Sequence, residues 1–111
     1  MINGINSREM ILEILLEIEE GEHSHVAIRN ALSKYQFLPK QDRAFITRVC
    51  EGTLEYRIQI DYIINSFSKV TVDKMKPAIR EILRSAVYQL KYMDSVPDSA
   101  VCNEAVKLAQ R

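Results

Sequence analysis

Apolar residues recur at the spacing of an α-helix along almost the whole chain, and this period limits the fold more than any other feature. An early stripe consists of Ile11, Ile14, Leu15 and Ile18, at i, i+3, i+4 and i+7. The cleanest stripe consists of Ile79, Ile82, Leu83, Ala86, Leu90 and Met93. No stretch alternates polar and apolar residues as a half-buried strand does. With only 3 Gly and 3 Pro in 111 residues, the pattern predicts an all-α fold.

Helix-capping residues, glycine and proline divide the chain into helices joined by short connectors. Asn6 is a plausible N-cap with Glu9 as its capping-box partner, and Gly21 ends that helix. Ser24 is the expected N-cap of a second helix that runs to about Ser33. Helices are further expected over 40–67, from Pro77, and after a cap at Asp98 or Ser99, with connectors at 35–39, 68–76 and 94–97. These elements predict one domain over 1–111, a bundle of about five or six helices.

The long segment 40–67 is expected to be one helix with room for a bend. Its inward positions are Phe45, Val49, Thr53, Tyr56, Ile60, Ile63 and Phe67. Gly52 lies in the middle, where glycine costs about 1 kcal/mol relative to alanine in an exposed helix. A glycine at such a position indicates that another helix passes close by.

Several classes of protein are excluded by what the sequence lacks. Residues 1–22 do not have the basic region and clean apolar run of a secretory signal, because Glu13 and Glu17 interrupt it. No window of about 18 uninterrupted apolar residues predicts a membrane span. Cys50 and Cys102 stand singly in apolar helical patterns, which favours buried thiols in a reducing compartment. We therefore expect a cytoplasmic protein without a membrane partner.

The residues that commonly carry catalysis are sparse. His23 and His25 share one helix junction without further metal ligands nearby in sequence. There is no glycine-rich phosphate loop and no dinucleotide fingerprint. The apolar helical settings of Cys50 and Cys102 argue against activated nucleophiles. We expect no catalytic, cofactor-binding or metal site in this chain.

Charge is balanced overall but unevenly distributed. The formal net charge is zero, yet residues 1–22 hold one arginine and six glutamates, so the remainder is basic. Residues 69–91 contain six lysines and arginines against two acidic residues. Such asymmetry predicts one basic surface rather than a uniformly basic protein.

A row of cations within the basic region is the main candidate binding surface. Lys76, Arg80 and Arg84 lie at i, i+4 and i+8, and Tyr88 and Lys91 continue the stripe. Cations can neutralise RNA phosphates and a ring can stack on an unpaired base. The commoner alternative is a solvated face with ion pairs to glutamates of a neighbouring helix.

Further cations extend this hypothesis across the second connector. Arg48, with Lys34 and Lys40, is a candidate for the same RNA surface. Arg43 is a candidate too, although it directly follows Asp42 and precedes Phe45. For Arg43 we favour a structural role, in which it pairs with an acidic residue of a packed helix.

The order of local phrases resembles the NusB family over nearly the whole chain. These phrases are DRAF at 42–45, EGTL at 51–54, IDYI at 60–63, PAIREILR at 77–84, YQL at 88–90, MDSVP at 93–97 and NEAVKLA at 103–109. No single phrase is decisive, but the ordered series at matching spacing is highly specific. The resemblance implies an all-α NusB-like bundle.

Two branches of the family share this fold. One comprises free-standing transcription antitermination factors. The other comprises the N-terminal domains of Sun-type methyltransferases, which modify cytosine C5 in small-subunit ribosomal RNA. Gly52-Thr53-Leu54 and Tyr88-Gln89-Leu90 resemble the methyltransferase branch. The N-terminus lacks the arginine cluster typical of antitermination factors and retains only Arg8. The chain also stops before a segment found in both branches, as a domain cut from a longer methyltransferase would.

The resemblance implies an RNA-binding accessory domain of a ribosomal RNA cytosine-5 methyltransferase. The parent enzyme would use S-adenosylmethionine and would hold the catalytic cysteines, a role that does not fall to Cys50 or Cys102. The implied partners are ribosomal RNA, a ribosomal protein and the catalytic domain. An antitermination factor that binds leader RNA with a ribosomal protein is one alternative. A protein-interaction module that never touches RNA is the other, and it predicts an exposed apolar patch.

Overall fold

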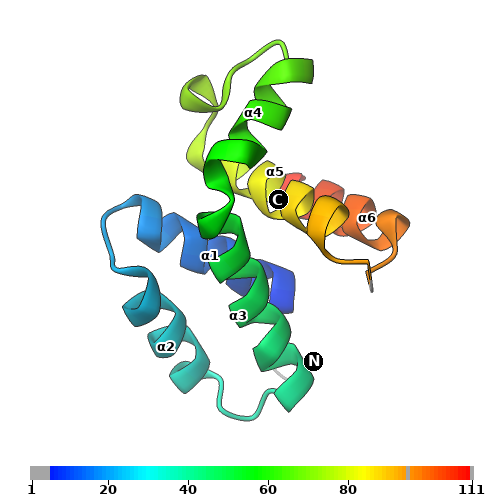
Figure 1. Cartoon of the computed structure of the whole chain (residues 1–111). Coiled ribbons are helices and arrows are strands. Elements are labelled where there is room, and N and C mark those ends of the chain that lie inside the picture. The colour runs from blue at the N-terminus through cyan, green and yellow to red at the C-terminus, as the bar shows by residue number, and fades with distance from the viewer. Residues whose placement is uncertain (1–5, 95, 111) are drawn as a thin grey trace.

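The computed structural model describes residues 6–94 and 96–110 and consists of helices joined by short connectors (Figure 1). Within those ranges it contains no strand, which confirms the all-α prediction. The elements are α1 (Ser7–Glu19), α2 (Ser24–Lys34), α3 (Lys40–Glu55), α4 (Arg57–Phe67), the 3-10 turn η1 (Val72–Lys74), α5 (Pro77–Tyr92) and α6 (Asp98–Ala109). Ser95, inside the predicted turn at 94–97, lies outside the described residues.

The expected end signals operate at α1 and α5, whereas the predicted caps of α2 and α6 are wrong, since His23 and Pro97 occupy those N-cap positions. The Asn6 side chain accepts a hydrogen bond from the Glu9 backbone N–H at 2.9 Å, as an N-cap does. Gly21 adopts φ +116° directly after α1, a conformation that glycine permits. Pro77 occupies the first turn of α5, where its missing N–H removes no helical bond. The sequence placed these boundaries to within a residue or two.

The segment 40–67 is two helices rather than one, which corrects the prediction. Tyr56 departs from helical geometry at φ −102° and ψ 20°, and its backbone N–H closes α3 on the Gly52 carbonyl. Its ring stacks on Tyr92 of α5 with the ring centroids 4.4 Å apart. α3 packs against α1 and α5, whereas α4 turns away from α3 and contacts α5 (Figure 1). No proline marks this break, and the helical spacing of apolar residues continues across it. The sequence pattern therefore predicts one helix where the structure has two.

The core lies where α1, α3 and α5 meet, and α2, α4 and α6 close it from the sides. Its largest fully buried side chains include Ile11, Ile14 and Leu15 of α1, Ile46 and Val49 of α3, and Ile60 and Ile64 of α4. α5 is contacted by α1, α3, α4 and α6 and so lies in the middle of the bundle. The described residues contain no helix long and apolar enough to cross a membrane.

Several residues expected inside lie at the surface. Phe67 is 68% exposed at the end of α4, and Ile79 and Leu90 of α5 are also exposed. Cys102 is exposed on α6, whereas Cys50 is buried as predicted. The buried face of α5 differs from the predicted one because helices surround α5 on several sides. Its buried arc is therefore wide and includes polar residues: Glu81, Arg84, Ser85 and Gln89.

Candidate nucleic-acid interface

The predicted cationic stripe of α5 does not form one continuous exposed row. Lys76 and Lys91 are exposed. Arg80 and Arg84 retain only 15% and 10% of their side-chain exposure, and Tyr88 is buried. The helix therefore presents its two ends to solvent and turns its middle toward neighbouring helices.

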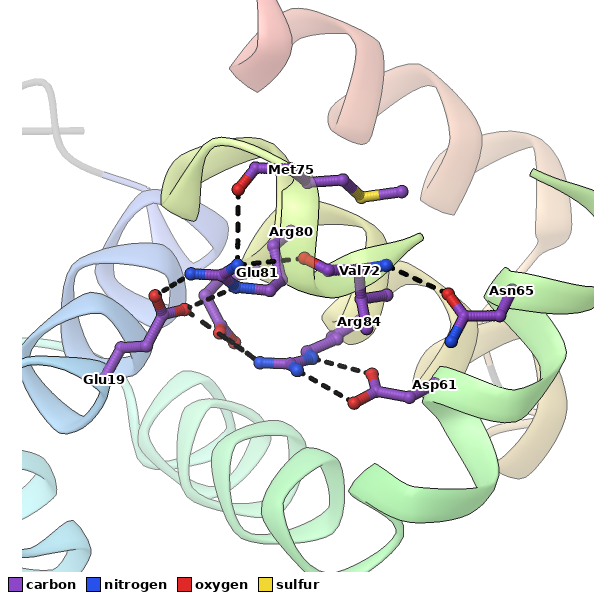
Figure 2. A network of polar contacts seen from close by, with 8 residues as sticks. All are labelled: Glu19, Asp61, Asn65, Val72, Met75, Arg80, Glu81 and Arg84. Carbon is purple, nitrogen blue, oxygen red and sulfur yellow. Dashed lines mark hydrogen bonds and ion pairs between the residues drawn. The ribbon is translucent and has the colours of Figure 1, made fainter. Parts of the chain in front are cut away.

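Arg80 holds three elements together. Its guanidinium pairs with the Glu19 carboxylate at the end of α1, in part through an Nε–Oε2 hydrogen bond of 3.1 Å. Its Nη1 donates to the carbonyls of Val72 and Met75 at 2.9 and 3.2 Å (Figure 2). Arg80 thus uses most of its donors within the fold.

Arg84 makes a bidentate ion pair across helices. Its Nε and Nη2 donate to the two carboxylate oxygens of Asp61 in α4, each at 2.8 Å. Its Nη1 donates to Glu81 at 2.7 Å and lies 4.0 Å from Glu19. The five charged residues Glu19, Asp61, Arg80, Glu81 and Arg84 form one ion network that links α1, α4 and α5 (Figure 2).

The two glutamates of the ion network have opposite pKa shifts. Burial raises the pKa of Glu81 to about 7, and its hydrogen bond to Glu19 acts in the same direction. The hydrogen bond from Arg80 lowers the pKa of Glu19 to about 2. At neutral pH Glu81 is therefore partly protonated beside an ionised Glu19.

Arg43 completes the end of α2. Its Nη1 donates to the carbonyls of Leu32 and Tyr35 at 2.9 and 3.2 Å. These belong to the last turn of α2 and the residue after it, where carbonyls lack helical partners. The contact is structural, but it is made to backbone oxygens rather than to an acidic side chain.

Arg48 and Lys91 come together although they are far apart in the sequence. Arg48 is exposed on α3, and its Nη2 donates to the Tyr92 carbonyl at 3.3 Å. The Lys91 Nζ lies 5.7 Å from the centroid of the Tyr92 ring. Both exposed cations thus contact Tyr92, Arg48 at the main-chain carbonyl and Lys91 at the ring.

A groove of about 570 Å³ runs along α3 near these cations and is called here the α3 groove. It is lined by Leu32, Lys40, Arg43, Ala44, Thr47, Arg48, Glu51, Gly52, Glu55 and Tyr88. The Tyr88 ring reaches it across Gly52, at which any Cβ would overlap the ring. The close helix approach predicted from Gly52 is therefore present.

Tyrosines stack beside the α3 groove. The Tyr88 and Tyr92 ring centroids lie 5.4 Å apart, and Tyr56 stacks on Tyr92. Tyr56 and Tyr92 are half-buried, and the Tyr92 hydroxyl bonds Gln59 at 3.1 Å. Tyr56 and Tyr92 are not among the predicted site residues. The i, i+4 spacing of Tyr88 and Tyr92 was the one available signal.

The seven predicted RNA-contacting residues thus divide by their surroundings. Arg80, Arg84 and Arg43 are held by intramolecular contacts, and Tyr88 is buried with an edge in the α3 groove. Arg48, Lys91 and Lys76 are exposed. RNA contact by any of them remains a prediction. No group of three or more potential metal ligands occurs among the described residues.

Sequence relatives fall into two groups. A probable ribosomal RNA small subunit methyltransferase B of Bacillus subtilis is 31% identical over 93% of this chain, which spans 23% of that protein. A Synechocystis protein of the same description is 34% identical over 96% of the chain, which spans 24% of its length. The transcription antitermination protein NusB of Acetivibrio thermocellus is 31% identical over 94% of the chain and 72% of that protein.

A solved structure has the same fold. It contains antitermination factors NusB and NusE in complex with dsRNA, and the match has a TM-score of 0.84 at 18% identity. The match covers 94% of this chain and 78% of the other. The NusB family profile matches residues 5–111. This profile match, over nearly the whole chain, shows that the chain belongs to the NusB family.

Proposed function

We propose that this chain is an RNA-binding accessory domain that helps a cytosine-5 methyltransferase engage small-subunit ribosomal RNA. The observation that carries the proposal is the similarity of 93–96% of the chain to about a quarter of two small-subunit ribosomal RNA methyltransferases. In such an enzyme the chemistry and S-adenosylmethionine would belong to the catalytic part, and this domain would supply attachment.

The α3 groove and the adjoining end of α5 are the proposed RNA surface. Lys40, Arg48 and Lys91 are exposed cations that can approach phosphates. The half-buried rings of Tyr56 and Tyr92 offer a partly open edge for an unpaired base. Glu51 and Glu55 also line the groove and repel phosphate. RNA would therefore lie toward the Arg48 and Lys91 side.

A titration with small-subunit ribosomal RNA fragments at several salt concentrations tests this surface. Arg48→Ala, Lys91→Ala and Lys40→Ala should each weaken binding and reduce the salt slope by about 1, because each removes one phosphate contact. Lys69→Ala is the matched control, since Lys69 is an exposed cation in the connector between α4 and α5. It should leave the slope unchanged.

The alanine variants of Arg80 and Arg84 must be interpreted separately in this assay. Their alanine variants would perturb the ion network, so weaker RNA binding would be informative only if the folded fraction were unchanged. Equal loss of binding for Lys69→Ala and Arg48→Ala would indicate diffuse attraction and contradict the proposed surface. Absence of binding at low salt would favour a protein-interaction module.

An antitermination factor is the second candidate, and its support is the match to 72% of the Acetivibrio thermocellus NusB protein. This reading predicts tight pairing with a ribosomal protein in the presence of leader RNA. Co-purification with the natural, full-length gene product would separate the two. A product that also methylates ribosomal RNA supports the first candidate, and a short product that retains a ribosomal protein supports the second.

A further inference from the structure

A second groove lies between α1 and α2, which run side by side on one flank of the bundle (Figure 1). Its volume is about 490 Å³. The apolar part of its lining consists of Met10, Ile14, Leu16, Ala31 and Tyr35. Met10 and Ile14 are fully covered, whereas Leu16, Ala31 and Tyr35 are partly open to solvent. The groove therefore has an apolar floor that a side chain can reach.

Glutamates form the rim of this α1–α2 groove. Glu13, Glu17 and Glu20 line it and are exposed, and Lys34 is the one cation in the lining. A neighbouring hollow of about 410 Å³ shares Glu17 and Glu20 and adds Glu22 at the turn after α1. The acidic wall thus continues from the middle of α1 to the end of the helix.

These carboxylates differ from their neighbour Glu19. Glu19 is held by Arg80, but no ion pair engages Glu13, Glu17 or Glu20 within residues 6–94 and 96–110. Glu13 and Glu17 are four residues apart and Glu17 and Glu20 are three apart, so they repel each other on one helix face. A cation from another molecule would relieve this repulsion.

We propose that the α1–α2 groove binds a basic amphipathic segment of a protein partner. Lysines or arginines of that segment would pair with Glu13, Glu17 and Glu20, and an apolar side chain would enter the floor between them. The acidic rim repels phosphates, so RNA is the disfavoured occupant. The inference goes beyond the proposed RNA binding and uses different residues.

Fluorescence anisotropy with a labelled amphipathic peptide of leucine and lysine tests the groove without RNA in the sample. We expect binding that weakens with salt. A companion peptide with glutamate in place of lysine should not bind. A second companion with serine in place of leucine should bind more weakly, because it cannot use the apolar floor.

The protein variant that locates the site is Glu13→Gln/Glu17→Gln/Glu20→Gln. It should lower peptide affinity about tenfold while circular dichroism stays helical. The matched control Asp73→Asn/Asp94→Asn/Asp98→Asn removes the same charge from exposed positions outside both grooves, and it should retain most of the affinity.

Three results would overturn the proposal. The first is that the basic peptide does not bind at low salt. The others are that both triple variants lose the same peptide affinity, or that the glutamate peptide binds as well as the lysine peptide. A fourth result would assign the groove to RNA instead of a protein partner. If RNA affinity changed more in the Glu13/Glu17/Glu20 variant than in the control, the groove would belong to RNA. Failure of RNA binding alone leaves the peptide result unaffected, so the two proposals are separable.

Discussion

At the scale of single residues, the contact between Gly52 and Tyr88 shows how one position shapes a surface. The glycine lets the Tyr88 ring lie against the α3 backbone, and the same ring edge lines the α3 groove. A larger residue would force the buried ring out of its stack with Tyr92.

Gly52→Ala should therefore lower the free energy of unfolding by about 1 kcal/mol. Overpacking costs about 1–3 kcal/mol, and the better helix propensity of alanine returns up to about 1 kcal/mol. Urea unfolding measures the change. In a Tyr88→Leu background, where the ring is absent, Gly52→Ala should become neutral or stabilising. An equal loss in both backgrounds would mean that the glycine matters for another reason.

Among the helices, α4 and α5 are joined by the ion pair of Arg84 in addition to the apolar packing of Ile60 and Ile64. α4 turns away from α3 at Tyr56 and contacts α5, where Arg84 meets Asp61. The Asn65 side chain also accepts a hydrogen bond from the Val72 backbone N–H at 2.9 Å and so ties η1 to α4. Polar contacts thus add to the apolar packing that holds α4 (Figure 2).

Arg84→Ala should destabilise the fold by about 3 kcal/mol, because it leaves Glu81 and Asp61 without their cation. Thermal or urea unfolding checks this. Lys91→Ala on the same helix is exposed and should stay within about 0.5 kcal/mol of the parent protein. Adding Asp61→Asn to Arg84→Ala should recover part of the loss, since it removes the carboxylate that Arg84 had paired. If the double variant were no more stable than Arg84→Ala, the loss of stability would come from the lost packing of the aliphatic part of the Arg84 side chain.

At the scale of the whole molecule, the ion network makes stability depend on pH. The folded state raises the pKa of Glu81 to about 7. Its contribution is therefore complete below about pH 4.5 and is lost as the pH rises through about 7. Glu19 has a lowered pKa of about 2, so its contribution is present above about pH 4.5 and is lost as the pH falls toward 2.

Glu81→Gln should remove the decline in stability between about pH 4.5 and 7. The decline in the parent protein is expected to be roughly 2–3 kcal/mol, and the variant should be the more stable protein above neutral pH. Urea unfolding at a series of pH values gives the profile. Glu55→Gln, at an exposed position on α3, should leave it unchanged. Parallel profiles for the parent and Glu81→Gln would show that another group titrates.

The helices, most of their ends and the family can be read from the sequence. These depend on local information: a 3.6-residue period, a capping pair such as Asn6 and Glu9, and a glycine such as Gly52 where a helix must pass closely. Such signals act between neighbours in the chain, so they can be read before the fold is known.

Tertiary structure alone decided which cations are free to meet a ligand. Arg80 and Arg48 look alike in the sequence, but Glu19 lies 61 residues from Arg80 and holds it. The break at Tyr56 and the exposure of Phe67 likewise depend on where α5 lies. Periodicity gives the face on which a side chain stands, but the residue opposite that face is set by helices packed from distant parts of the chain.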